Sequence, residues 1–352
     1  MITRRELLSM GCTLAAAAVL PRAAESQTPA PAAPADPMSL VNIEFRPALE
    51  QFLKTAGEGG HLDDATLKQL RDHGFPTPPP ALTPAVREQL IPGPTGAPQV
   101  KVYVCGDAAG ASKPAVLHMH GGGYVLGSAL SSRREIQDLA TTHNCVAVTV
   151  EYRLAPETHF PGSLEDNYAA LRWMHSNAKE LGIDTTRIAV KGESAGGGHA
   201  AALAIAARDR GEFPLCLQVL IYPMLDDRTG SSRQIPGQFG KYIWTPQMNR
   251  YGWTALLGVP AGASTVPANS VPARVADLAG LAPAFIGVGS IDLFAPEDID
   301  YAQRLISSAV PTELSLVPGA FHAFDALIPQ ASLSIQFKQA WNEAIRRAFT
   351  AS

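Results

Sequence analysis

Hydrophobic residues occur along the chain in two alternating patterns. Short continuous apolar runs are typical of strands buried on both faces of a sheet, whereas apolar residues spaced by three and four are typical of amphipathic helices. The first pattern predicts strands at 86–91, 100–105, 115–119, 145–150, 188–190, 217–221, 284–288 and 314–317. The second predicts helices at 132–143, 164–181, 195–209, 296–307 and 332–349. Because strands and helices alternate, we expect an α/β domain with a mostly parallel, doubly wound sheet of about eight strands.

Two segments depart from this alternation. Residues 39–80 carry two helical patterns ahead of the sheet, the first running from Val41 to Phe52 and the second starting at Asp63. Residues 226–281, within the domain 81–352, contain no strand pattern, and Thr245-Pro246 is typical of a helix N-cap and its first residue. Ligand sites of open sheets lie beyond the carboxyl ends of the strands, where such insertions occur. The insertion is therefore either part of a lid or a peripheral helix whose aromatic residues pack on the sheet.

The first residues of the chain differ from the rest. Arg4-Arg5 precedes an apolar stretch, 14–20, that is far shorter than the ~20 residues of a membrane-spanning helix. This pattern predicts an export signal at 1–24 that resembles bacterial twin-arginine signals, followed by a Pro/Ala-rich tether at 25–38. We therefore expect an exported protein, periplasmic or secreted, without a stable membrane anchor. The alternative is that the arginines begin an ordinary amphipathic helix.

Composition narrows the classes of protein. The sequence is 46% hydrophobic and 17% charged, which excludes a disordered chain and supplies a sizeable core. Its 28 Lys and Arg against 32 Asp and Glu give a net charge of −4, so no basic excess favours nucleic acid. Beyond the predicted signal the cysteines are Cys105, Cys145 and Cys216, an odd number that cannot form a closed set of disulfides.

Glycines surround a serine at one strand-to-helix junction. The segment 192–198 (GESAGGG) lies between the predicted strand 188–190 and the helix that follows it. A serine at the apex of such a sharp turn is held in a strained backbone conformation, and its close neighbours must be glycine because strand and helix nearly touch. Ser194 is thus a candidate nucleophile at a helix N-terminus, where the helix dipole stabilises negative charge.

A second glycine run, 120–123 (HGGG), follows the predicted strand 115–119. Consecutive glycines leave backbone N–H groups unshielded, so two of them can donate to a developing oxyanion together with the N–H of Ala195. The alternative is a flexible turn without a chemical role.

A nucleophilic serine needs a base, and the base needs an acid that orients it. His322 lies on a loop after the last predicted strand, and Asp292 lies on the loop after the strand before it. Because the carboxyl ends of parallel strands meet at one edge of a sheet, we expect Ser194, Asp292 and His322 to converge. The other acids near enough in the sequence to replace Asp292 are Glu297, Asp298 and Asp325.

Taken together, these motifs resemble the hormone-sensitive-lipase-like esterases, the bacterial family IV carboxylesterases of the α/β-hydrolase fold. The matching segments are 120–123 (HGGG), 152–157 (YRLAPE), 192–197 (GESAGG), Asp292 and His322. The resemblance implies that Ser194 is the nucleophile, His322 the general base and acid, and Asp292 its orienting partner. It also implies an oxyanion hole formed by Gly122, Gly123 and Ala195, and a cap in which the N-terminal helices join the insertion.

The sequence departs from the family pattern at several positions. Glu193 stands where the family usually has Asp or Thr, so it either bonds within the catalytic pocket or supports the turn. Asp292 is not followed by proline, and His322 is followed by Ala323 where glycine is common. Within the YRLAPE segment we expect Arg153 and Glu157 to form a structural polar pair.

The resulting hypothesis is a serine carboxylic-ester hydrolase that acts through an acyl-enzyme on short- to medium-chain esters. Its partner is a small-molecule ester, and the chemistry implies neither a metal nor an organic cofactor. Candidate substrate-binding residues are Tyr124, Trp244, Tyr251 and Trp253. The alternatives are an amidase or peptidase on the same three residues, and a non-catalytic small-molecule-binding protein of this fold. The presence of His322 argues against the latter.

Overall fold

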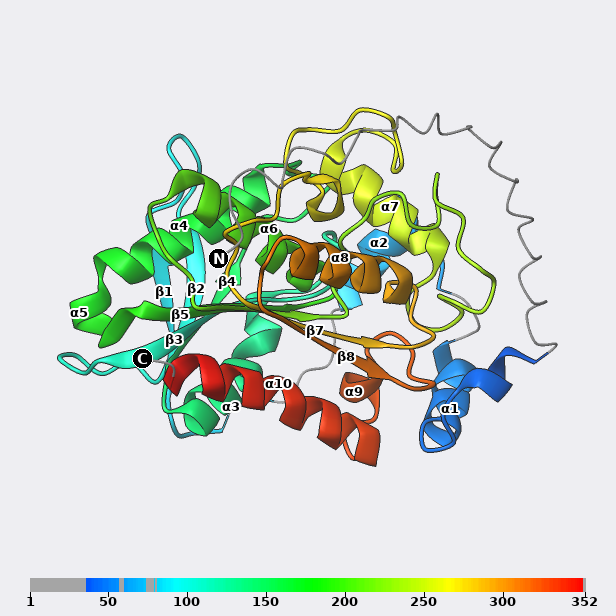
Figure 1. Cartoon of the computed structure of the whole chain (residues 1–352), viewed down its shortest axis with the longest axis horizontal. Coiled ribbons are helices and arrows are strands. Elements are labelled where there is room, and N and C mark those ends of the chain that lie inside the picture. Colours follow the sequence, from blue (N-terminus) through cyan, green and yellow to red (C-terminus); the bar gives the residue numbers. More distant parts are fainter. Residues whose placement is uncertain (1–35, 57–59, 74–78, 80, 351–352) are drawn as a thin grey trace, which may run out of the picture. The chain divides into compact units, whose positions relative to one another are not determined.

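The fold is built on an eight-stranded sheet (Figure 1). The structure is a computed structural model, and it describes residues 36–56, 60–73, 79 and 81–350. The predicted export signal and all but the end of the tether lie outside these residues. The strands are β1 (Val86–Ile91), β2 (Val100–Cys105), β3 (Lys113–Met119), β4 (Val146–Glu151), β5 (Ile183–Glu193), β6 (Leu217–Ile221), β7 (Ala284–Gly289) and β8 (Thr312–Val317).

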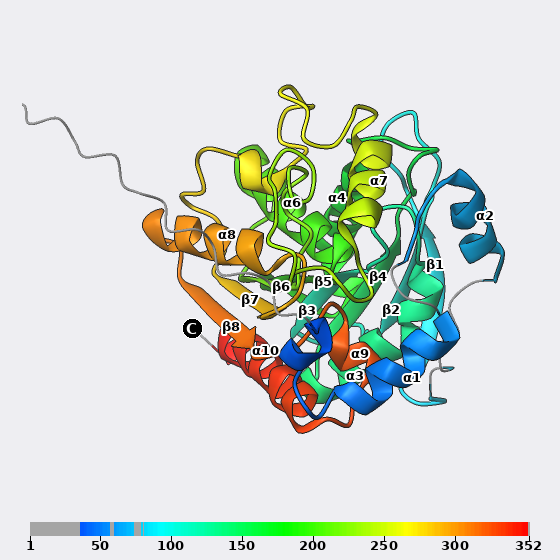
Figure 2. The same cartoon turned by 90° about the vertical axis from the view of Figure 1, so that its right-hand side faces the viewer.

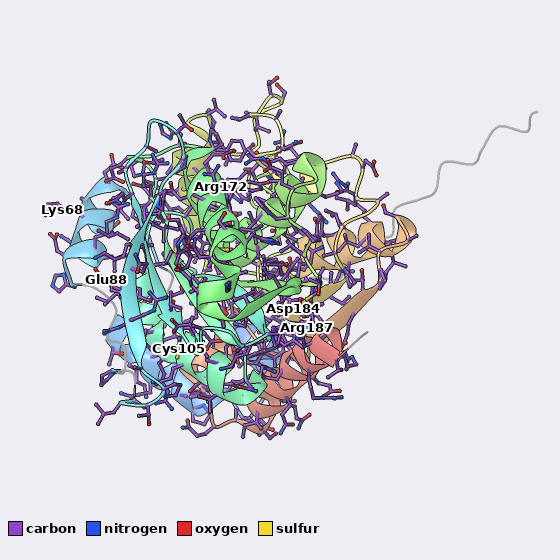
Figure 3. All side chains as sticks on the ribbon, turned by 90° about the vertical axis from the view of Figure 1, so that its left-hand side faces the viewer. Lys68, Glu88, Cys105, Arg172, Asp184 and Arg187 are labelled. Carbon is purple, nitrogen blue, oxygen red and sulfur yellow. The ribbon has the colours of Figure 1, made fainter. Side chains whose placement is uncertain are left out.

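The strand order is β1-β2-β4-β3-β5-β6-β7-β8. β1 and β2 form an antiparallel pair, β2 runs antiparallel to β4, and all other neighbours are parallel. The predicted fold class and the eight strands are thus confirmed. The largest difference is β5, which begins before the apolar run because the backbone at Ile183 pairs with Lys113. The ion-paired Asp184 and Arg187, labelled in Figure 3, extend this start with polar residues that the hydrophobic pattern does not detect.

Helices cover both faces of the sheet (Figures 1 and 2). One face carries α4 (Gly162–Ser176), α6 (Ala195–Arg210) and α8 (Ala295–Ser307), which bury their apolar residues in one core cluster with the sheet. The other face carries α3 (Arg133–His143) and α10 (Ser332–Thr350). The short α5 (Ala178–Leu181) follows α4 after a break at Asn177, a poor helix former. This two-sided cover is the doubly wound arrangement that the sequence predicts.

The insertion after β6 forms a cap with α2 (Asp64–His73). Its helix α7 (Pro246–Leu257) begins at Thr245, whose hydroxyl accepts from the Met248 N–H, and ends at Gly258 in the left-handed conformation. Gln247 of α7 both donates to and accepts from the backbone of Leu62. A third core cluster joins α2 and α7 to the turn at Ala195, so the insertion packs on the edge of the sheet where Ser194 lies. No helix in the described ranges has the length and apolar character to cross a membrane.

The helix α1 (Arg46–Ala56) does not join this cap, contrary to the expectation for 39–80. Phe45, directly before α1, is fully buried, and its ring lies 6.1 Å from that of Phe321 and 5.3 Å from that of Phe324. Phe324 begins the short helix α9 (Phe324–Leu327). The apolar side of α1 therefore packs beside α9 and α10, under the loop that carries His322, because that is where its aromatic partners lie.

We predict that Phe45→Ala lowers the free energy of unfolding by about 3–5 kcal/mol, because it empties a site enclosed by aromatic rings. Urea unfolding measures the change. Ile43→Ala is the matched control, since Ile43 is 75% exposed, and it should stay within about 0.5 kcal/mol of the wild type. A Phe45→Ala protein as stable as the control would contradict the docking of α1.

Candidate active site

Ser194 lies at the turn between β5 and α6 in a backbone conformation that side chains rarely adopt. Its φ is 57° and its ψ is −122°. Neighbouring backbone groups hold this strained residue, because the Ser194 N–H donates to Ile221 O and the Ser194 carbonyl accepts from the Met224 N–H. Ser194 therefore depends on β6 as well as on β5 for its position.

The turn at Ser194 is possible only because glycines stand on both sides of the serine. A Cβ on Gly196 would lie 2.1 Å from the carbonyl oxygen of Met119, and one on Gly192 would lie 2.2 Å from the carbonyl oxygen of Gly196. Both distances are far shorter than any real contact, so the glycines of the motif are required by the close approach of β3, β5 and α6.

Ser194, His322 and Asp292 form one hydrogen-bonded chain. His322 Nε2 lies 3.0 Å from Ser194 Oγ, and His322 Nδ1 lies 2.9 Å from Asp292 Oδ2. The other Asp292 oxygen accepts from the Phe294 N–H at 3.0 Å. Because a carboxylate only accepts, Nδ1 carries the ring proton and Nε2 is left to accept from the serine hydroxyl. The three residues are almost wholly buried.

The other acids considered for the Asp292 position are engaged elsewhere. Glu297 accepts from the N–H groups of Leu225 and Asp226, and Asp325 accepts from the Tyr222 hydroxyl. Asp298 is buried, and its carboxyl oxygens have no hydrogen-bond partner among the described residues. Burial raises the pKa of Glu297 and of Asp298 well above the usual range, and the charge of Asp226 adds to the shift at Glu297.

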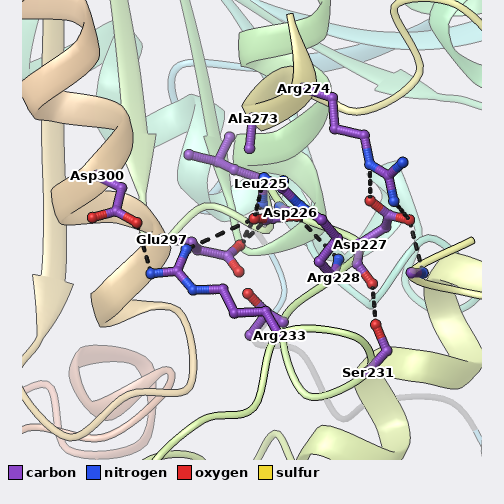
Figure 4. Close-up of polar contacts among 12 residues, drawn as sticks. Leu225, Asp226, Asp227, Arg228, Ser231, Arg233, Ala273, Arg274, Glu297 and Asp300 are labelled. Atoms are coloured by element: carbon purple, nitrogen blue, oxygen red, sulfur yellow. Dashed lines mark hydrogen bonds and ion pairs between the residues drawn. The ribbon is translucent and has the colours of Figure 1, made fainter. Parts of the chain in front are cut away.

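Figure 4 shows what Glu297 does instead. It binds the first backbone N–H groups of the insertion, while Arg228 forms an ion pair with Asp226 and Arg274 with Asp227. This network binds the start of the insertion to α8 and, through Arg274, to a segment near its end. Glu297 is thus a structural residue of the cap base.

The glycine loop after β3 lies against Ser194. A Cβ on Gly121 would lie 3.4 Å from Ser194 Cβ, and Gly122 and Gly123 have φ values of 125° and 60°, which favour glycine. The N–H groups of Gly122, Gly123 and Ala195 donate no hydrogen bond to any described residue. The arrangement therefore leaves free donors beside Ser194 Oγ, at the N-terminal end of α6.

Three aromatic rings enclose His322. Tyr222, Phe294 and Trp244 have ring centroids 4.9, 5.2 and 6.4 Å from the imidazole. Only Trp244 was among the sequence candidates. Phe294 and Tyr222 were missed because each lies in an apolar stretch that resembles ordinary core, although Phe294 follows Asp292 by only two residues.

The remaining sequence candidates for substrate binding lie in other contacts. Trp253 is fully buried against Tyr124, and the Tyr124 hydroxyl donates to Met224 O. The Tyr251 hydroxyl donates to Asp64 and so joins α7 to α2. Burial places Trp253 in the core between cap and sheet, so it is not a lining residue in this structure.

Arg153 and Glu157 do not form the expected pair. Arg153 binds both carboxylate oxygens of Asp166, whereas Glu157 binds Arg71 of α2. The Arg71 guanidinium also donates to the carbonyl oxygens of Val125 and Ala155. Glu157 pairs with Arg71 because α2 packs beside it, and the sequence pattern does not predict where α2 packs.

A serine at a strained strand-to-helix turn of a parallel sheet, bonded to a histidine that is itself bonded to a carboxylate, with both partners on loops after later strands, is the arrangement of an α/β hydrolase. The described residues contain no group of three or more His, Cys, Asp or Glu placed to hold a metal ion. Comparison with known proteins agrees with this class, since the family model described as the α/β hydrolase fold matches residues 116–326.

Individual relatives narrow the class. Carboxylesterase NlhH of Mycobacterium tuberculosis is 35% identical over 288 residues, which cover 79% of this chain and 87% of the relative. Esterase LipI of the same organism is 33% identical and covers 74% of this chain and 81% of the relative. A bacterial heroin esterase superposes with a TM-score of 0.78 at 32% identity, covering 90% of this chain and 100% of that one. The chain belongs to the hormone-sensitive-lipase-like family of carboxylesterases.

We predict a pH-dependent effect for Asp325, which lies half-buried beside Tyr222. Burial, reinforced by the charge of Glu193, raises the pKa of Asp325 to about 6. The unfolded carboxyl titrates near 3.9, so between about pH 4 and pH 6 the folded protein holds a proton that the unfolded chain has lost. Stability from this group therefore falls as pH rises through that window.

Asp325→Asn removes this titration but keeps an acceptor for Tyr222. The unfolding free energy of Asp325→Asn relative to wild type should rise between about pH 4 and pH 7, by at most about 3 kcal/mol. Urea unfolding at several pH values measures it. A difference that does not change with pH would show that Asp325 is ionised normally in the folded protein.

Proposed function

We propose that Ser194, His322 and Asp292 are the catalytic triad of a carboxylesterase that acts on short- to medium-chain esters through an acyl-enzyme. The observation that carries this proposal is the unbroken chain of hydrogen bonds from Ser194 Oγ through His322 to Asp292. The hydrolase family of the chain supports it, as do the free N–H donors beside the serine.

In the first half-reaction, His322 Nε2 takes the proton of the Ser194 hydroxyl as Oγ attacks the ester carbonyl carbon. The N–H groups of Gly122, Gly123 and Ala195 stabilise the oxyanion of the tetrahedral intermediate. His322 then gives its proton to the alcohol oxygen, and the alcohol leaves. In the second half-reaction, His322 activates a water that releases the acid from Ser194. Asp292 stays ionised and stabilises the imidazolium that forms in each step.

Ser194→Ala should abolish hydrolysis of p-nitrophenyl acetate and butyrate, and Asp292→Asn should lower kcat by about 10⁴-fold, because the amide no longer fixes the proton on Nδ1. A fluorophosphonate should label wild type at Ser194 once per chain and should not label Ser194→Ala. Both variants should remain folded and should unfold at about the same denaturant concentration as wild type. Full activity of Ser194→Ala, or an inactive wild type, would refute the proposal.

We propose that Trp244 limits the length of the acyl chain that the site accepts. A Cβ on Gly123 would lie 2.1 Å from Trp244 Cη2, so the indole rests on the glycine loop, and its other neighbour is the ring of His322. The Trp244 Nε1–H donates to Asn249 Oδ1 at 3.3 Å, which ties the ring to α7. A rigid ring beside both the oxyanion donors and the base leaves little room for a long chain at the reacting carbonyl.

We predict that Trp244→Ala raises the ratio of kcat/KM for p-nitrophenyl octanoate to that for the acetate by about 10-fold or more, since a few added methylenes gain contact. The ratio is independent of the amount of active enzyme. Phe213→Ala is the control, because Phe213 packs on Tyr168 and His175 far from Ser194, and it should keep the wild-type ratio. An unchanged ratio in Trp244→Ala would place the acyl chain elsewhere.

A further inference from the structure

A group of buried and partly buried ionisable side chains lies directly behind Ser194, on the side of the sheet that carries α3 and α10. Because side chains alternate along a strand, Lys191 and Glu193 of β5 point to the same face. Lys191 and His118 of β3 are 2% and 1% exposed. Glu135 of α3 completes the group. None of these residues takes part in the proposed reaction.

The hydrogen bonds within this group fix the protons. His118 Nε2 lies 2.8 Å from Glu193 Oε2, and His118 Nδ1 lies 3.0 Å from Thr149 Oγ1 on β4. Lys191 Nζ donates to Glu193 and, at 2.9 Å, to Glu135. Burial alone would raise the pKa of Glu193, but the charge of Lys191 and the bond from His118 outweigh it and hold the pKa below its usual range. Glu193 is therefore a carboxylate, and His118 Nε2 is its donor.

These two side chains connect the two segments that supply the oxyanion donors. His118 is two residues before the glycine loop, and Glu193 directly precedes Ser194. The backbones of the segments already touch, because a Cβ on Gly121 would lie 2.9 Å from Glu193 O. Among the described residues, His118–Glu193 is the one side-chain hydrogen bond that joins the glycine loop's strand to the nucleophile's strand at this end.

We propose that His118 and Glu193 are positioning residues that set the spacing between Gly122–Gly123 and Ala195, and thereby the shape of the oxyanion hole. This inference rests on the proposed triad and oxyanion hole. An oxyanion must be met by its donors within a few tenths of an ångström, since hydrogen bonds weaken steeply with distance and angle. A charge-assisted bond between a buried histidine and a partly buried carboxylate on neighbouring strands resists the small separation that would misplace one donor.

The alternative role for Glu193 is to neutralise the buried Lys191, and variants of His118 separate the two. His118→Phe removes the donor and keeps the ring volume, while Lys191 still has both carboxylates. His118→Gln is the matched control, because its Nε2–H can still donate to Glu193. Glu193→Gln is a second variant that keeps an acceptor for His118 and loses the charge.

The measurement is kcat and KM for p-nitrophenyl butyrate per site titrated with fluorophosphonate, together with the inhibition constant of an alkyl trifluoromethyl ketone, which forms a tetrahedral adduct. His118→Phe should lower kcat by 10- to 100-fold with KM within twofold of wild type, and should weaken the ketone by the same factor. His118→Gln should regain most of both, and Glu193→Gln should fall between.

Wild-type kcat and ketone affinity in titrated His118→Phe would overturn the proposal, even if its stability has dropped. Equal losses in His118→Phe and His118→Gln would also overturn it, because they would show that the hydrogen bond is irrelevant. Should His118→Phe fail to fold, wild-type kcat and ketone affinity in Glu193→Gln would also overturn the proposal, because it requires the charge of Glu193 to strengthen the bond. An inactive wild type would instead refute the proposed function, so the two failures are distinct.

Discussion

The strained backbone of Ser194 is the constraint on which the site depends. A residue with a φ of 57° between a buried strand and a helix persists only where its surroundings determine it. Here β6 binds its N–H and the segment after β6 binds its carbonyl, while glycine lets α6 approach β3 to a distance that no side chain permits. The same turn begins α6 at Ala195, whose N–H donates no hydrogen bond to any described residue. Strain and electrostatic stabilisation thus have one structural origin.

The two faces of the sheet contribute differently to this site. The carboxyl edge and the cap hold the groups that contact substrate in the proposed mechanism. The face under α3 and α10 holds groups that support it: Phe45 packs under the His322 loop, Asp325 binds the tyrosine whose ring faces His322, and Glu193 binds His118. The histidine and serine loops, which meet in a 3.0 Å contact, are therefore supported by a packed core on this face and by Trp244 of the insertion on the other side.

Much of the fold, and the convergence of Ser194, His322 and Asp292, was predictable because local signals coincide with the tertiary constraints. The apolar runs at β1, β2 and β6 have the bounds of the strands, and Thr245-Pro246 begins α7 as a capping pattern should. What escaped prediction depends on partners distant in sequence. The position of α1 follows from Phe321 and Phe324, and Glu157 pairs with a residue of α2. The spacing of hydrophobic residues predicts that one face of an element is buried, but it does not predict which elements cover that face. These contacts can therefore be identified only from the three-dimensional structure.

Glutamate fits position 193 because its carboxylate must reach both His118 and Lys191. Lys191 is the register partner of His118 on the adjacent parallel strand, and Glu193 lies two residues further along, so a side chain at 193 must span diagonally to reach Nε2. Glutamate closes this distance to 2.8 Å and still presents its second oxygen to Lys191. Aspartate is one methylene shorter and cannot serve both partners without moving the backbone of the turn. Because that backbone carries Ser194, the residue before the nucleophile and the residue at 118 form one unit with Lys191, and a change at any one of them alters the conditions for the other two.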